Sequence, residues 1–339
     1  MNPKFWRAAT TALLLTLLPL SALAQEIACK GEDLIARYAT QQPDLFTTLR
    51  QQADDLPYSK GILWKIEHEG VAPSFVFGTM HISDPRLLDL PEAAKEAFAR
   101  STTVALEIAE IVDPQKMAAA ASGLLRYTAY LDGTTLDDRM TSEQIELLKP
   151  VVAEKTGMTW AVARGMRPGI LMGMVSLPMC ELARKRAGKP FLDMYLGQRA
   201  QAEDKGLVGL ETIESQLQVL DRLPEDMLIR TIVQAAQFGA LLDDVFETMI
   251  VQYEKGEIGL IWSMFHMLGP NGLVPPGSAP DYGAFQRIVV DERNVTMAQE
   301  SEKLIREGGA FIAVGALHLP GEKGVLNLLA QKGFRISRP

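Results

Sequence analysis

Short apolar runs separated by longer amphipathic stretches make up most of the chain. Residues 61–67 and 74–79 alternate or are wholly apolar, with a glycine-containing turn between them, and this pattern predicts a β-hairpin. Four more short runs are typical of strands, at residues 102–107, 207–211, 311–317 and 334–337.

Longer stretches with apolar residues three and four positions apart predict helices. A helical segment is expected at 32–56, punctuated by Pro43, and the helix at 160–187 is expected to kink or break at its prolines. A proline- and glycine-rich loop is predicted at 269–283. The other predicted helices are 91–100, 114–130, 142–155, 191–204, 214–221, 224–255, 282–307 and 324–332.

The predicted strands lie near both ends of the chain, so any sheet must be assembled from distant segments. A helical insertion at about residues 113–190 separates them. The pattern predicts an α/β or α+β domain with a mixed central β-sheet flanked by many helices.

The first 24 residues have the pattern of a secretory signal. Lys4 and Arg7 precede an apolar stretch at 11–20, and small residues precede Gln25. We expect cleavage there, a single domain over residues 25–339, and a periplasmic or secreted protein. An uncleaved anchor is the alternative, and no later stretch has the pattern of a membrane span.

Charge and cysteine content narrow the class further. The formal charge is −8 and becomes −10 without Lys4 and Arg7, so no basic stripe for nucleic acid or anionic lipid is expected. The cysteines are Cys29 and Cys180, which in an oxidising compartment most simply form a disulfide. Two buried thiols or a thiolate metal site are the alternatives.

Four of the predicted strands finish on a residue that can bind metal or transfer a proton. These residues are His81, Glu107, Glu211 and His318. Ligands bind beyond the carboxyl ends of strands in open α/β sheets, so strands that share one edge would bring two imidazoles and two carboxylates together.

The two histidines also share their context. Val76-Phe77-Gly78-Thr79-Met80-His81 parallels Ala313-Val314-Gly315-Ala316-Leu317-His318 as apolar-apolar-Gly-x-x-His. Gly78 and Gly315 are the glycines of this repeated motif, and glycine permits the close backbone approach that a ligand-binding edge requires.

Two neutral imidazoles with carboxylates suit Zn²⁺, Mn²⁺, Co²⁺ or Fe²⁺ and leave positions open for water or substrate. Such a metal activates water, and Glu107 or Glu211 would then act as general base. No HExxH sequence is present. The alternative is that each histidine only satisfies a strand end.

Further candidates follow the long loop. Arg293 is a candidate to clamp a substrate carboxylate or stabilise an oxyanion, with Glu292 and Asn294 beside it as substrate-binding candidates. A solvated helix face is the alternative for all three. Asp193 is interpreted as a helix N-cap in preference to a carboxylate that supports the site, and His68 as a solvated turn residue.

At these residues the chain resembles the TraB/GumN family (TraB/PrgY/GumN), which includes the pheromone-shutdown protein TraB and the animal Tiki proteases. Each motif is weak alone, but their order and spacing over about residues 60–338 are specific. In chain order they are Phe77-Gly78-Thr79-Met80-His81, Leu106-Glu107, Leu192-Asp193-Met194-Tyr195, Val208-Gly209-Leu210-Glu211-Thr212, Glu292-Arg293-Asn294, Val314-Gly315-Ala316-Leu317-His318-Leu319 and Gly333-Phe334.

The resemblance implies an EreA/ChaN-like α/β core and metal-dependent peptidase activity. The paired Gly-x-x-His motifs of the family map onto His81 and His318, its strand-end glutamate onto Glu107, and a second acidic position onto Glu211. Its helical Glu-Arg motif maps onto Glu292 and Arg293. We expect no counterpart of the C-terminal anchor of the animal relatives, and the cysteine pair and N-terminal extension resemble the secreted bacterial branch.

These observations give three hypotheses of different classes. The first is a periplasmic metal-dependent hydrolase, a peptidase, with Mn, Co or Zn as cofactor. The second is a non-catalytic protein that binds a peptide or small molecule in the crevice beyond the strand ends. Such binding would not need the four residues His81, Glu107, Glu211 and His318. The third is a scaffold, with which the acidic composition and long helices are compatible.

Overall fold

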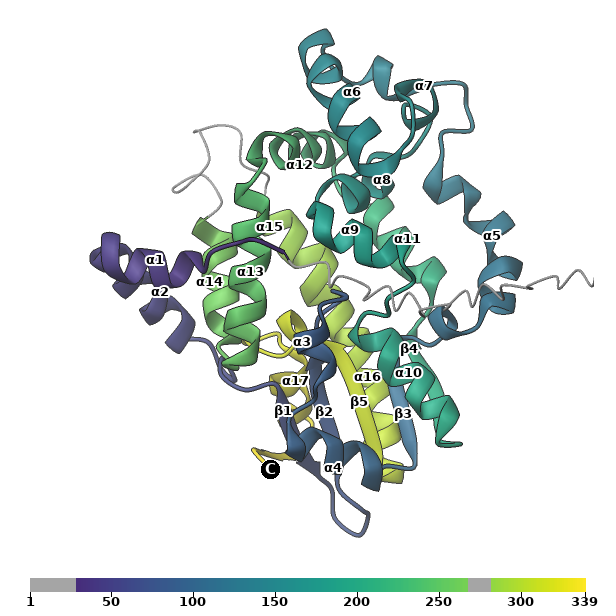
Figure 1. The fold of residues 1–339 in the computed structure, drawn as a ribbon. Helices are drawn as coiled ribbons and strands as arrows, with labels where there is room; N and C mark the ends of the chain where they lie inside the picture. Colours follow the sequence, from purple (N-terminus) through teal and green to yellow (C-terminus); the bar gives the residue numbers. More distant parts are fainter. Residues whose placement is uncertain (1–28, 268–281) are drawn as a thin grey trace, which may run out of the picture.

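A computed structural model describes residues 29–267 and 282–339 and contains a mixed six-stranded sheet in the order β4-β3-β5-β2-β1-β6, which lies in the lower half of Figure 1. The strands β4, β3, β5 and β2 are parallel to one another, and β1 is antiparallel to both of its neighbours. The bounds are β1 Leu63–Glu67, β2 Ser74–Thr79, β3 Thr103–Ile108, β4 Gly206–Glu211, β5 Ala310–Gly315 and β6 Arg335–Ser337. The predicted α/β class with a mixed central sheet is confirmed.

Helices cover both faces of this sheet. One face carries α4 (Glu92–Arg100), α10 (Leu192–Ala202), α13 (Leu241–Glu254) and α14 (Ile258–Met267), and the other carries α16 (Glu292–Glu307) and α17 (Val325–Gln331). The remaining helices are α1 Leu34–Gln41, α2 Pro43–Asp54, α3 Pro85–Leu88, α5 Pro114–Thr128, α6 Ser142–Thr156, α7 Trp160–Ala163, α8 Pro168–Val175, α9 Met179–Arg186, α11 Ile213–Asp221, α12 Glu225–Phe238 and α15 Tyr282–Phe285.

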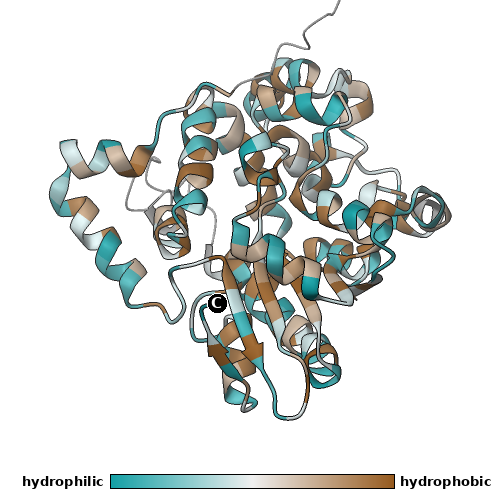
Figure 2. Ribbon diagram, turned by 60° about the horizontal axis from the view of Figure 1, so that its bottom comes forward, coloured by the Kyte–Doolittle hydropathy of each residue, from teal (hydrophilic) through white to brown (hydrophobic). Residues whose placement is uncertain are grey.

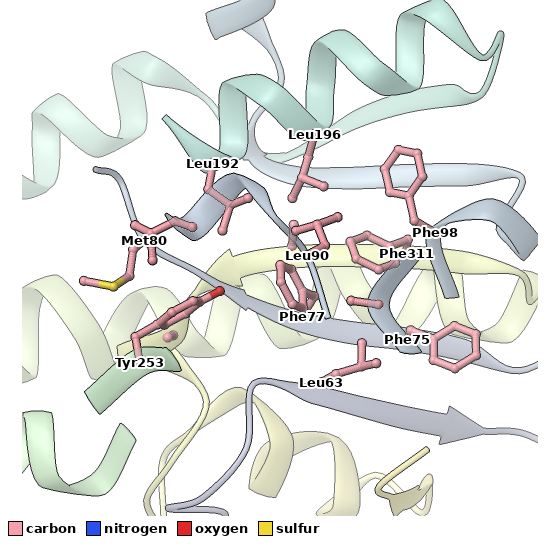
Figure 3. Packing of buried hydrophobic residues seen from close by; sticks show 14 of the residues in the cluster. Leu63, Phe75, Phe77, Met80, Leu90, Phe98, Leu192, Leu196, Tyr253 and Phe311 are labelled. Carbon is pink, nitrogen blue, oxygen red and sulfur yellow. The ribbon is translucent and has the colours of Figure 1, made fainter. Parts of the chain in front are cut away.

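The inner strands are buried on both faces, which explains their continuous apolar sequences. Figure 2 shows apolar residues along the central strands. On the α4 and α10 face, the ring of Phe311 lies 5.5 Å from Phe77 and 5.2 Å from Phe98 (Figure 3). Burial of each such side chain contributes about 1.5–3 kcal/mol, so this layer fixes the strands whose ends carry the candidate residues.

Three predicted elements are interrupted in the structure. Residues 224–255 are not one helix, because Gly239 adopts a φ of 51° and separates α12 from α13. The predicted helix 282–307 contains a π-helical turn at Gln286–Asp291, between α15 and α16. The predicted strand 311–317 ends at Gly315. A 3₁₀ turn, Ala316–His318, follows it and packs against Gly78.

The break predicted within 160–187 is confirmed, since α7, α8 and α9 occupy this stretch. The predicted disulfide is also confirmed. Cys29 and Cys180 are bonded, with a Cα–Cα distance of 5.3 Å, and they link the segment before α1 to α9. The predicted signal at 1–24 and most of the predicted loop at 269–283 lie outside the described residues. No helix in the described part of the chain is long and apolar enough to cross a membrane.

Candidate active site

Four candidate side chains lie at the edge of the sheet where the parallel strands end. Glu211 is the last residue of β4 and Glu107 the penultimate residue of β3. His81 follows β2 by two residues, and His318 closes the 3₁₀ turn after β5. Because all four strands point the same way, the topology places these residues at one edge, as the sequence predicts.

Glu107 lies at the centre of this group. Its carboxylate is almost fully buried, and its Oε1 accepts a hydrogen bond of 2.6 Å from the backbone nitrogen of Gly315. The Nε2 atom of His81 lies 3.9 Å from Oε2, and that of His318 lies 3.8 Å from Oε1. Burial favours the protonated acid, but the adjacent imidazoles and the Arg293 guanidinium outweigh it and hold the pKa of Glu107 well below its usual range.

The ring of His81 is oriented by Asp193. Its Nδ1 lies 2.8 Å from Oδ2 of Asp193, whose Oδ1 accepts a hydrogen bond of 2.8 Å from the Thr79 hydroxyl. The Asp193 carboxylate raises the pKa of His81 to about 9, although more than half of the His81 side chain is exposed. With Nδ1 directed at a carboxylate, Nε2 is the atom that faces Glu107.

The N-cap interpretation of Asp193 is therefore wrong. Phe191 occupies the N-cap position of α10, and Asp193 is the second residue of the helix. Its position in the first turn aims the carboxylate at the end of β2, where Thr79 and His81 use both oxygens.

His318 is oriented in the same way by an amide. Its Nδ1 lies 2.6 Å from Oδ1 of Asn294, and Nδ2 of Asn294 donates to the carbonyl oxygen of Lys323. Since that carbonyl only accepts, the amide oxygen faces His318, which places the imidazole proton on Nδ1 and a lone pair on Nε2. Burial lowers the pKa of His318 to about 4, so the ring is neutral near pH 7.

Arg293 connects the two glutamates. Its Nη2 donates to Oε2 of Glu107 and to Oε2 of Glu211, each at 2.6 Å, and its Nε donates to both oxygens of Glu211. Its Nη1 lies 3.4 Å from Nε2 of His318. The amide of Gln216, absent from the sequence-based candidates, donates to both glutamates at 3.1 Å. Glu211 thus faces a guanidinium rather than an imidazole.

Gly78 and Gly315, the glycines of the repeated Gly-x-x-His motif, have different surroundings. A Cβ on Gly315 would lie 3.1 Å from Oε1 of Glu107, 3.3 Å from Cδ2 of His318 and 3.7 Å from Nε2 of His81. A Cβ on Gly78 would instead collide with Leu319, at 2.8 Å. Gly315 therefore leaves a space between the three donor side chains, whereas Gly78 lets the segment after β5 pack against β2.

Within residues 29–267 and 282–339, no three His, Cys, Asp or Glu side chains have the spacing of a formed metal site. The imidazole and carboxylate side chains of the cluster are nevertheless of the types that bind a divalent metal. The two Nε2–carboxylate distances, 3.8 and 3.9 Å, are near the limit for ligands that each lie about 2 Å from one ion. As metal ligands both imidazoles would be neutral, and the carboxylates of Glu107, Glu211 and Asp193 with one guanidinium would then carry a formal charge of −2, which one divalent cation would balance.

A cavity of about 340 Å³ borders the outer side of this cluster, between α11 and α16. Glu211 and Arg293 form its inner wall, and Val219 and Thr296 are among its other lining residues. Glu292 lies on its rim, where it pairs with Arg222 at 2.5 Å. The cavity therefore reaches two members of the cluster, Glu211 and Arg293.

A second buried network fixes the chain just after His81. Glu181 on α9 is fully buried, and its two oxygens accept from the backbone nitrogen of Ser83 at 2.9 and 3.0 Å. Arg184 on the same helix pairs with buried Asp84 at 2.9 Å. The helix that carries Cys180 therefore holds the segment that follows His81.

His68 lies apart from the site. It follows β1, which runs antiparallel to β2, so it lies at the opposite edge of the sheet. The side chain is not simply solvated, as the sequence suggests, because its ring lies 5.4 Å from Phe334 and its Nε2 lies 3.4 Å from Nη1 of Arg306.

The chain is similar in sequence to known proteins over most of its length. The sequence profile of the TraB/PrgY/gumN family matches residues 62–338. The chain is 27% identical to the zebrafish (Danio rerio) protein named metalloprotease TIKI1 and 26% identical to human metalloprotease TIKI1. These alignments cover 81% and 85% of the chain but only 62% and 63% of the relatives. No solved structure matches the chain with significance.

Proposed function

Because the chain belongs to the TraB/PrgY/gumN family, we propose that it is a metal-dependent hydrolase that cleaves peptide substrates. The observation that carries the proposal is the arrangement of His81 and His318 around Glu107, with both Nε2 atoms within 4 Å of the carboxylate. The names of its metalloprotease relatives support peptide as the substrate class.

In this proposal His81, His318 and Glu107 hold the metal, which is Mn²⁺, Co²⁺ or Zn²⁺. Two imidazole nitrogens and one carboxylate leave positions open for water and substrate. Asp193 and Asn294 fix the ring orientations, as hydrogen-bonded partners of metal ligands do. A metal held there would activate a water molecule and polarise a substrate carbonyl.

Glu211 and Arg293 have separate roles in the proposed reaction. Glu211 is the carboxylate left over once Glu107 serves as a ligand, so it accepts the proton of the attacking water. Arg293 stabilises the negative charge that develops on the substrate oxygen. Its Nη1 is the donor available for this, because its contacts with Val289 and His318 are long, at 3.3 and 3.4 Å.

We propose a periplasmic or secreted location for the protein. The Cys29–Cys180 disulfide supports it, because structural disulfides persist in oxidising compartments and are rare in the cytosol.

Hydrolysis of a fluorogenic casein by protein stripped with a chelator and then resupplied with Mn²⁺, Co²⁺ or Zn²⁺ tests the proposal. We expect activity only after metal addition, and its loss in Glu107→Gln. His68→Ala, a histidine change at the opposite edge of the sheet, is the control that keeps activity. Folded protein that binds peptides without turnover, and still binds them as His81→Ala, would favour the non-catalytic binding protein instead.

A further inference from the structure

Arg293 contacts two of the three side chains that the proposed function assigns to the metal. Its Nη2 donates to Oε2 of Glu107 at 2.6 Å, and its Nη1 lies 3.4 Å from the Nε2 lone pair of His318. A metal ion at this site would therefore compete with the guanidinium for the same two atoms, Oε2 of Glu107 and Nε2 of His318. The contacts of Glu107 with Arg293 and Gln216 leave its Oε2 saturated as it stands.

Charge adds to this competition. The Arg293 side chain is 10% exposed and that of Glu107 is 6% exposed, so water screens little of the field between the guanidinium and a neighbouring cation. Removing the Arg293 guanidinium would make the cluster more negative by one charge, so the cluster would attract a divalent cation more strongly.

The surroundings of Arg293 allow it to leave Glu107 without losing its other partner. Three of its contacts, of 2.6, 3.0 and 3.2 Å, are with Glu211, and they do not involve Glu107. Gln216 remains to donate to Glu107 at 3.1 Å. The cavity of about 340 Å³ that Arg293 lines gives the guanidinium room to shift away from the histidines.

We propose that Arg293 is a resident cation that occupies the metal-binding side chains in the metal-free protein and lowers their affinity for metal. Its Nη2 holds Glu107 and Glu211 together. When metal binds, Arg293 gives up Glu107 and His318 and keeps Glu211. This inference rests on the proposed function, since it requires that the site bind metal.

Calorimetric titration of chelator-stripped protein with Mn²⁺, Co²⁺ and Zn²⁺ tests the inference without any activity assay. For Arg293→Met we expect a Kd at least about tenfold lower than that of the wild type, because a competing positive charge is gone. Arg293→Lys keeps the charge but not the planar fork, so its Kd should stay within about threefold of the wild type. Arg126→Met, which removes the exposed pair with Glu214, is the control and leaves the Kd unchanged.

The outcomes separate this inference from the proposed function. An unchanged or higher Kd in Arg293→Met overturns the inference and leaves the metal site standing. Failure of both wild type and variant to bind metal overturns both. If Arg293→Met is too unstable to titrate, the Tm of the variant and of the wild type is measured with and without metal instead. We then expect metal to raise its Tm more than that of the wild type, and an equal or smaller rise overturns the inference.

Discussion

The Oε1 atom of Glu107 lies 2.6 Å from the backbone nitrogen of Gly315. This hydrogen bond joins β3 to the end of β5 and holds the carboxylate beside the two histidines. It also brings the α-carbon of residue 315 so close that a methyl group there would meet Glu107 and His318.

Replacing Gly315 by alanine should therefore close the space between the donors. We expect the metal affinity to fall more than about tenfold and the free energy of unfolding to fall by about 1–3 kcal/mol, because the inserted methyl overpacks the site. Titration calorimetry and urea unfolding measure the two effects. Gly173→Ala is the matched control, since a Cβ there meets nothing within 4 Å and the change should be neutral or slightly stabilising. Unchanged metal affinity in Gly315→Ala would show that the metal lies elsewhere.

Asp193 should matter for metal affinity more than for folding. In Asp193→Asn the amide oxygen still accepts from Thr79, but the charge that orients His81 is lost. We expect a loss of about 10- to 100-fold in metal affinity, the usual effect of removing such a partner. Asp226→Asn, in a surface pair with Arg230, is the control. Equal affinities in the two variants would remove Asp193 from the site.

The Cys29–Cys180 disulfide should stabilise the whole domain. It closes a loop with a sequence separation of 151, and loss of such a bond typically costs about 2–5 kcal/mol. Urea unfolding of the protein with and without reductant measures this difference. The Cys29→Ser/Cys180→Ser variant should match the reduced protein and show no further response to reductant. An unfolding curve that reductant does not move would contradict the prediction.

Glu181 should hold the segment that follows His81. In Glu181→Ala the buried amide of Ser83 loses its partner, which costs about 1–3 kcal/mol. Hydrogen exchange at the Ser83 amide should become faster, with smaller changes in the strands. Glu146→Ala, at an exposed position, is the control and should alter stability by less than about 0.5 kcal/mol. Unchanged exchange at Ser83 would argue against this role.

The sheet and the residues at its edge could be predicted from the sequence for physical reasons. Strands buried on both faces have short apolar sequences, and the polar residue that ends each apolar run marks the carboxyl end of the strand. That is why His81, Glu107, Glu211 and His318 were found from pattern alone. The helix breaks at Gly239 and at residues 286–291 were not found, because a glycine or a π turn changes the hydrophobic period too little.

The partners of the candidate residues could not be predicted in the same way. The sequence favours a cap for Asp193 because helix starts favour aspartate, and only the tertiary position of α10 over the sheet directs its carboxylate at His81. The sequence pattern gave no indication of Gln216, since its amide donates to two carboxylates, Glu107 and Glu211, that are far apart from each other in sequence. The position of Arg293 between Glu107 and Glu211 likewise depends on how α16 crosses the strand ends.

The proposed function requires that His81 and His318 bind a metal ion. Elemental analysis of protein incubated with Mn²⁺, Co²⁺ or Zn²⁺ and then dialysed answers this directly. We predict one metal ion per chain in the wild type and in His68→Ala, and none in His81→Ala/His318→Ala that melts as a folded protein. Folded wild-type protein that retains no metal, or a double variant that retains as much as the wild type, would contradict the account.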